Sequence, residues 1–327
     1  MRFLLILCLC VPVFFSYCNR PAGAWTIYRN PVVRHRNLSI NDAAVQAIAR
    51  TSEGVWFGLP GGLVRLHNRA WTGYAKEDGI PGRIVWSLFA QGDSLLWIGA
   101  EDGIAVFRNG AFRSDSSANL RLHDAVSVVA DGKRIFVGTP AGVFVAQPRF
   151  AGADLHLDSL VFLRQPGTAV ESLYAGSMEL DSEGGGLWVG THAGVVRIDA
   201  KGRWSRWLEK EPLPGNTVYD ILWDREKRCL WAATGGGLFR IAENGSVEKM
   251  NAGLSDSAAT CLGQRNGRLW IGTLKGANLL DPATGKVTCF FEKDGLANNA
   301  IRSVFVDQYG VWFGCLLGGI ARFQGES

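Results

Sequence analysis

The chain has 327 residues, a formal net charge of +4 and only 20% charged residues. No basic run with interleaved aromatics accompanies this small charge, which excludes the electrostatic signature of nucleic-acid binding. The 41 glycines and 12 tryptophans are typical of many short buried strands joined by tight turns, and an all-β unit of this length can form one domain.

The N-terminal segment predicts export. An apolar run of 13 residues over 3–15 follows the first basic residue and is shorter than the roughly 20 residues of a membrane-spanning helix. Two processing sites compete: the small residues ending at Ala24 favour a signal peptide over 1–24, whereas a loosely lipobox-like segment favours a lipoprotein signal that ends before Cys18 and places a lipid on it. We expect a periplasmic, outer-membrane-anchored or secreted protein that touches a membrane only through such an anchor.

A short motif recurs seven times beyond this segment: an aromatic, one variable residue, a small residue that is usually glycine, and a glycine four residues later. The aromatics lie 41, 39, 52, 43, 39 and 42 residues apart, which is the period of a four-stranded β-propeller blade. The large ring supplies the area that packs one blade on the next, and the final glycine supplies the positive φ of a tight hairpin. The seven aromatics are Trp56, Trp97, Phe136, Trp188, Trp231, Trp270 and Trp312.

Each copy predicts four antiparallel strands. The second copy contains an inner strand over 85–88, a second strand over 95–99 and a third over 104–107, and residues 71–74 are the fourth strand of the first copy. In the last copy one inserted residue makes Gly319 the expected turn glycine.

The long step of 52 residues places a surplus at 147–157, between the third and fourth strands of blade 3. Such an extension would either dock a partner or be a tolerated insertion, and we favour the insertion because surface loops accept length at little entropic cost.

The seventh copy lacks its fourth strand at the C-terminal end of the chain. Residues Trp25–Tyr28 match the fourth strand Trp71–Tyr74 of the first copy. An open edge would template aggregation, so we expect the N-terminal strand to close the last blade. The prediction is a single seven-bladed β-propeller over 25–327.

The motif resembles the two-component regulator propeller repeat. The resemblance rests on Asp78-Gly79-Ile80 followed by 85–88 and 96–100, and on Asp294-Gly295-Leu296 followed by 301–304 and 311–315. In that family such propellers commonly form the periplasmic sensor part of membrane-bound hybrid kinases. No membrane-spanning, kinase or DNA-binding segment follows here, so the resemblance implies only a sensor-like input domain.

Binding residues are expected on the face where, in propellers, the loops entering the inner strands and the turns between the second and third strands surround the central channel. Loops on a rigid scaffold are where function concentrates. The position after the first apolar residue of each inner strand is the most varied one in the repeat and holds Gln46, Trp86, Ser127, Glu171, Tyr219, Thr260 and Arg302. The ligand-binding candidates on this face are Arg83, Trp86, Asp102, Glu171, His192, Asn216, Tyr219, Lys275, Asn299 and Arg302. The alternative for each is an ordinary solvated loop residue.

Catalytic signatures are sparse. The propeller resembles, more distantly, the streptogramin lyases, whose site implies a metal-assisted histidine and glutamate arrangement, but none of the five histidines lies in an H-x-E or E-x-H pair. His192 alone falls in a turn expected to face the channel. No G-x-S-x-G, phosphate loop or zinc spacing is present, so no catalytic residue, metal or cofactor is predicted.

Four cysteines lie beyond the signal: Cys229, Cys261, Cys289 and Cys315. Their spacing lacks the CxxC pattern of a metal site, and export permits disulfides that the sequence does not assign. We favour the interpretation that they are small buried apolar residues.

Three functions remain open. Aromatics with mixed charges around a channel favour a non-catalytic module that binds a small polar or glycan-like ligand. A protein-interaction platform on a broad propeller face is the alternative, and a lyase-like enzyme is the second alternative, because fold alone does not fix function.

Overall fold

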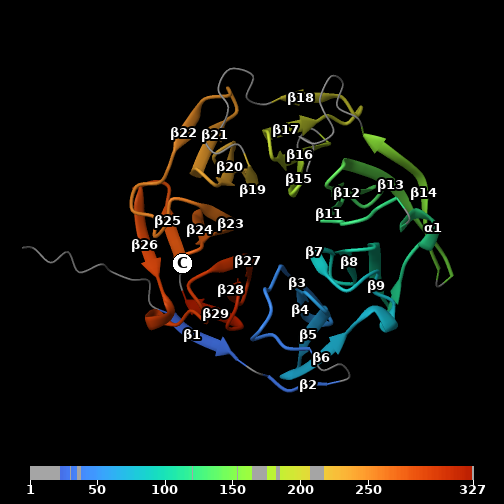
Figure 1. Ribbon diagram of the computed structural model, residues 1–327. Coiled ribbons are helices and arrows are strands. Elements are labelled where there is room, and N and C mark those ends of the chain that lie inside the picture. Colours follow the sequence, from blue (N-terminus) through green and yellow to red (C-terminus); the bar gives the residue numbers. More distant parts are fainter. Residues whose placement is uncertain are drawn as a thin grey trace, which may run out of the picture.

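Seven β-sheets stand around a central axis like the blades of a propeller (Figure 1) in the computed structural model, which describes residues 23–325 apart from 30, 35–37, 120, 153, 164–174, 182–184 and 207–216. Each blade is a four-stranded antiparallel sheet that runs from an inner strand beside the axis to a fourth strand at the rim. This confirms the fold expected from the repeat. Blade 1 carries a fifth, two-residue strand that pairs in parallel with its rim strand.

The blades follow one another along the chain. From the axis outward, the first three consist of β3 (Ala47–Thr51), β4 (Gly54–Leu59), β5 (Gly62–His67) and β6 (Ala70–Tyr74); β7 (Val85–Gln91), β8 (Leu95–Ala100), β9 (Gly103–Arg108) and β10 (Ala111–Arg113); and β11 (Ser127–Ala130), β12 (Ile135–Thr139), β13 (Gly142–Ala151) and β14 (Asp154–Leu163). Blades 4 and 5 consist of β15 (Ser177–Asp181), β16 (Gly186–Thr191), β17 (Gly194–Ile198) and β18 (Trp204–Arg206), and of β19 (Val218–Asp224), β20 (Cys229–Thr234), β21 (Gly237–Ala242) and β22 (Val247–Lys249).

Blade 6 consists of β23 (Ala259–Arg265), β24 (Arg268–Thr273), β25 (Gly276–Asp281) and β26 (Lys286–Phe290), and blade 7 of β27 (Ile301–Asp307), β28 (Gly310–Cys315), β29 (Ile320–Gly325) and β1 (Gly23–Tyr28). The extra strand of blade 1 is β2 (Val33–Arg34), and short helices are α1 (Ser116–Asn119), η1 (Lys76–Asp78) and η3 (Glu292–Asp294).

The repeated aromatic of each second strand packs against the following blade. Trp56 lies 4.7 Å, centroid to centroid, from Phe107 of blade 2, and the rings of Trp188 and Trp223 stack at 5.7 Å between blades 4 and 5. Second strands such as β4 are buried along their whole length. The core is therefore a series of layers between blades, and no single blade buries its apolar surface alone.

The N-terminal strand closes the ring as expected. β1 pairs with β29 from Gly23 opposite Gly325 to Tyr28 opposite Ile320, and the blue and red strands lie side by side in Figure 1. The Trp25 ring lies 5.0 to 5.6 Å from three phenylalanine rings of blades 6 and 7. The expected domain boundary after residue 24 falls inside β1, because the strand begins at Gly23.

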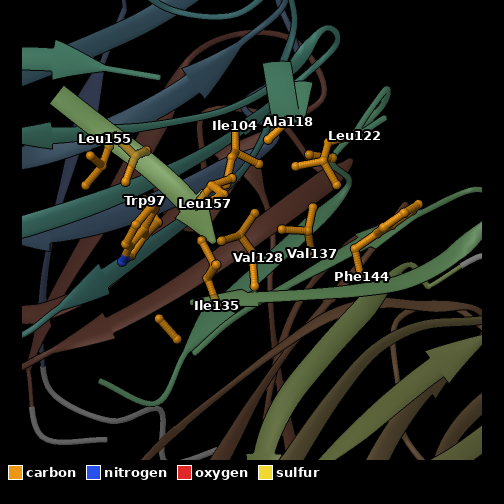
Figure 2. Packing of buried hydrophobic residues seen from close by; sticks show 14 residues of the cluster. Trp97, Ile104, Ala118, Leu122, Val128, Ile135, Val137, Phe144, Leu155 and Leu157 are labelled. Atoms are coloured by element: carbon orange, nitrogen blue, oxygen red, sulfur yellow. The ribbon is translucent and has the colours of Figure 1, made fainter. Parts of the chain in front are cut away.

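The surplus of blade 3 is a long hairpin that packs on blade 2. β13 and β14 have ten residues each, and their tip reaches the rim of the preceding blade. Leu155 and Leu157 are buried in one cluster with Trp97. Figure 2 shows these two side chains of β14 packed beside side chains of blades 2 and 3. The backbone N–H of Leu157 donates to Asp115 Oδ2 at 2.9 Å. The insertion therefore packs on blade 2 beside α1 and the segment that follows β10.

Two smaller predictions are also met. Gly319 (φ 102°) occupies the turn position of blade 7, directly before β29. None of the four cysteines forms a disulfide, and the expected burial holds for Cys229, Cys261 and Cys315, whereas Cys289 is partly exposed. Burial raises the pKa of Cys261 to about 12 and that of Cys315 to about 11, so both behave as small apolar residues.

Candidate functional site

The loops entering the inner strands and the turns between the second and third strands share one face of the ring, here called the channel face. They are tied to one another by backbone hydrogen bonds, such as Gly61 N–H to Arg83 O at 2.7 Å and Asp124 N–H to Glu101 O at 2.8 Å. The hairpin turns at the other end of the inner strands form the opposite face.

Four inner strands begin with a β-bulge at the channel face. The pairing register shifts between Val85 and Ser87 of blade 2, and at the same point in blades 5, 6 and 7. The residue skipped by each shift has no partner in the ladder, and bulges of this kind re-aim a side chain. The four bulged residues are Trp86, Tyr219, Thr260 and Arg302.

These side chains meet in a pocket of about 510 Å³ at the mouth of the channel. All seven blades contribute to its wall, and besides the bulged residues it includes Gln46, Asp124, Ser127, Ser177, Asp220, Cys261 and Ser303. Tyr219 is 44% exposed. The pocket therefore combines two accessible aromatic rings with hydroxyl, carboxyl and guanidinium groups, a composition suited to polar organic ligands.

Pairs of polar side chains hold the aromatic and cationic groups of the pocket in place. The Trp86 indole Nε1 donates to Asp124 Oδ1 at 3.3 Å, and Arg302 Nε donates to Gln46 Oε1 at 2.8 Å. Both contacts join neighbouring blades. Because a guanidinium has five N–H donors, Arg302 retains donors beyond this one contact.

The strand register corrects two positions of the predicted ring. Ser127 pairs with Gly138 as Ser87 pairs with Gly99, so the residue equivalent to Trp86 in blade 3 is Val126. In blade 4 the equivalent residue is Gly176, because Ser177 pairs with Gly190. Glu171, the residue predicted at this position, lies outside the described residues. The ring position equivalent to Trp86 is therefore apolar in blade 3 and lacks a side chain in blade 4, where a serine and a glutamate were expected.

Of the ten candidate residues, Trp86, Tyr219 and Arg302 line the pocket, and Glu171 and Asn216 lie outside the described residues, as does Cys18. The other described candidates sit farther out and make local contacts. Asp102 pairs with Lys76 at 3.0 Å, Lys275 with Asp256 at 3.5 Å, and the Asn299 Oδ1 accepts the Glu292 N–H.

The remaining two, Arg83 and His192, are exposed loop and turn residues that do not line the pocket. Within the described parts of the chain, no three His, Cys, Asp or Glu side chains form a group able to hold a metal ion, and no helix is long and apolar enough to span a membrane.

Sequence reasoning missed the carboxyl group at the floor of the pocket. Asp220 accepts hydrogen bonds from Ser177 Oγ of blade 4 at 2.8 Å, from Leu262 N of blade 6 at 2.8 Å and from its neighbour Ile221 N. Burial raises its pKa to about 6 despite these donors. Asp220 therefore ties three blades together beneath the ligand-accessible residues. An acid directly after a bulge residue was the available signal.

Comparisons with known proteins support the fold. No family model and no curated protein matches the chain. Among solved structures, it is similar to the extracellular domain of a putative hybrid two-component system from B. thetaiotaomicron, with a TM-score of 0.72, 18% identity, and coverage of 94% of this chain and 40% of that one. A second such domain from the same organism gives a TM-score of 0.69 and 20% identity, covering 88% and 40%.

A third similar structure is a catalytically inactive virginiamycin B lyase from Staphylococcus aureus with quinupristin, with a TM-score of 0.71 and 14% identity, covering 93% of this chain and 99% of that one. The chain thus spans about two-fifths of the extracellular domains and almost the whole lyase. The resemblances expected from the repeat are confirmed, at the level of the propeller fold.

Proposed function

We propose that the protein is an exported, non-catalytic, sensor-like propeller that binds a small polar or glycan-like ligand in the channel-face pocket. The observation that carries the proposal is the convergence of Trp86, Tyr219 and Arg302 on one concavity. Around a concavity these three side chains can contact one small ligand together, which they could not do on a flat surface.

The chemistry of the pocket matches a saccharide-like molecule. Aromatic rings stack on the apolar faces of sugar rings, while a fixed guanidinium, hydroxyls and carboxyls form hydrogen bonds with the sugar hydroxyl groups. Trp86 and Arg302 are both already oriented by contacts across blade junctions. Such preorganisation reduces the entropy lost on binding.

The test is calorimetric titration of the protein with a panel of neutral and acidic oligosaccharides, after a thermal-shift screen. A ligand from this panel is expected to bind the wild type, with at least tenfold weaker binding by Trp86→Ala and by Tyr219→Ala, since each removes a stacking surface worth about 1.5–3 kcal/mol. Arg83→Ala, on the same face outside the pocket, is the matched control. Equal affinities of all four proteins would refute the pocket as the binding site.

A protein partner on the same face is the second candidate function. Leu274 of blade 6 and Leu316 and Leu317 of blade 7 lie in adjacent second turns and are 43% to 54% exposed. Apolar side chains gathered on a propeller face favour protein contact. Leu316→Ser would weaken such an interaction and leave saccharide binding unchanged.

A further inference from the structure

A recurrent hydrogen bond at the opposite face is absent from blade 6, where the residue at the acceptor position can only donate, and also from blade 4, where Asp181 instead pairs with Arg197. In four blades the indole N–H of the second-strand tryptophan donates to the side chain that ends the inner strand. The pairs are Trp56 with Thr51 at 2.9 Å, Trp97 with Gln91 at 2.8 Å, Trp231 with Asp224 at 3.4 Å and Trp312 with Asp307 at 3.3 Å. Each of these inner-strand residues supplies an oxygen acceptor.

Blade 6 has Arg265 at this position. Arg265 pairs with Arg268 across the first hairpin as Thr51 pairs with Gly54 and Asp307 with Gly310. A guanidinium only donates. Accordingly, Trp270 Nε1 and Arg265 Nη1 are both buried and have no acceptor among the described residues.

Blade 7, the next blade, does not compensate the positive charge of Arg265 either. At two other junctions the acceptor also binds a polar side chain from the next blade: Arg50 pairs with Asp307 at 2.6 Å, and Gln264 donates to Asp224 at 2.8 Å. The residue equivalent to Arg50 in blade 7 is Val306, which has no polar group. A partly buried cation without a counter-charge is costly.

Arg265 lines a groove of about 520 Å³ between the first hairpin turns of blades 5 and 6. Arg225 lines the same groove, is exposed and makes no hydrogen bond or ion pair with a described residue. Of the two acidic residues in the wall, Asp224 is occupied by Trp231, Gln264 and Lys227, which leaves the exposed Glu226. The balance of unpaired charge favours an anion.

We infer that this groove binds an oxyanion, a sulfate or phosphate group, through Arg225 and Arg265. The planar guanidinium fork matches two oxygens of such a group, and charge-assisted hydrogen bonds of this kind are about twice as strong as neutral ones. The anion provides the guanidinium groups that line the groove with the oxygen acceptors that no described residue offers to Arg265 Nη1. The site lies on the face opposite the channel-face pocket.

Titration with sodium sulfate and sodium phosphate, with sodium chloride holding the ionic strength constant, tests the inference through the thermal midpoint and calorimetry. The wild type is expected to show saturable binding, and Arg265→Gln and Arg225→Gln at least tenfold weaker binding. A phosphorylated or sulfated monosaccharide in a parallel titration separates a free anion from a substituent, because a substituent site binds the sugar ester more tightly than the inorganic ion.

Arg265→Gln is an informative variant because in blade 2 a glutamine at the same position, Gln91, accepts the indole N–H of Trp97. Its thermal midpoint without anion is therefore expected to equal or exceed that of the wild type, which distinguishes loss of binding from misfolding. Arg69→Gln removes an exposed charge from the same face of blade 1 and should bind as the wild type does. A non-saturable response, or an equal response in Arg265→Gln, would show that no such site exists.

Discussion

Glu179, in the inner strand of blade 4, is a carboxyl group whose charge the fold disfavours. Burial and the neighbouring Asp220 carboxyl raise its pKa to about 8 from a usual value of 4.5, against the opposing effects of the Trp223 N–H at 2.7 Å and the Arg225 charge. The folded protein therefore holds the Glu179 proton more tightly than the unfolded chain does. By linkage, this stabilisation is fully present below pH 4.5 and is lost as the pH rises through about 8.

Replacing Glu179 by Gln keeps an acceptor for the Trp223 N–H and removes the titration. We expect the thermal midpoint of Glu179→Gln to match the wild type near the acid end and to exceed it by several degrees above pH 8, where the wild type must bury a charge. Unfolding measured by circular dichroism across this range checks the divergence. Glu53→Gln, which removes an exposed carboxyl, should stay parallel to the wild type, and parallel curves for Glu179→Gln would contradict the assignment.

At the scale of elements, the long hairpin of blade 3 contributes side chains to the apolar layer between blades 2 and 3. Leu155 and Leu157 are only 2% and 7% exposed, whereas Val161 on the same strand is 50% exposed. Leu157→Ala should lower the free energy of unfolding by about 2–4 kcal/mol, because it removes buried methyl groups and leaves a cavity. Val161→Ala, measured by the same denaturant titration, should change it by less than about 1 kcal/mol. Similar losses in the two variants would mean that the hairpin tip does not contribute to the core.

The strands of the blades were predicted from the sequence to different degrees. Glycines and large aromatics at a fixed period predicted the ring, since each has one structural role in a blade, and the match of Trp25–Tyr28 to Trp71–Tyr74 predicted its closure. The register of blades 3 and 4 was harder to predict. In blade 3 the valines at 126, 128 and 129 lie close together, so the sequence pattern does not mark which residue is equivalent to Trp86. Backbone pairing with Gly138 and Gly190 fixes it in the structure.

The site residues whose position follows from the repeated backbone geometry were predicted correctly. The residues whose side chains pair with nearby charges were not. Trp86, Tyr219 and Arg302 occupy the same bulge position in three different blades, so they converge on the channel. The turn residues Asp102 and Lys275 sit farther out and pair with nearby charges, which no repeat pattern encodes. Arg265 becomes informative only when the ends of the inner strands are aligned by their hydrogen bonds.

At the scale of the whole molecule, one strand pair converts seven stacked blades into a closed ring. Each blade contacts its two neighbours, so opening the ring between β1 and β29 would expose the inner layer at Trp25 and leave an unpaired edge. The closure joins residues near both ends of the described chain, and constraining it should stabilise the fold chiefly through the unfolded state.

A disulfide across this pair tests the role of closure. Thr26 and Arg322 are directly opposite in the ladder and partly exposed, and Thr26 lies beyond both expected processing sites. Cross-strand Cα separations of about 4.5–5.5 Å fall within the range that a disulfide spans. The oxidised Thr26→Cys, Arg322→Cys variant should gain on the order of 4 kcal/mol relative to its reduced form, because the cross-link closes nearly the entire chain into a loop. Denaturant unfolding with and without reductant measures the gain, with the single Arg322→Cys variant as control. If the oxidised and reduced proteins unfold at the same midpoint, the two strands separate before the blades do, and ring closure does not limit the stability of this propeller.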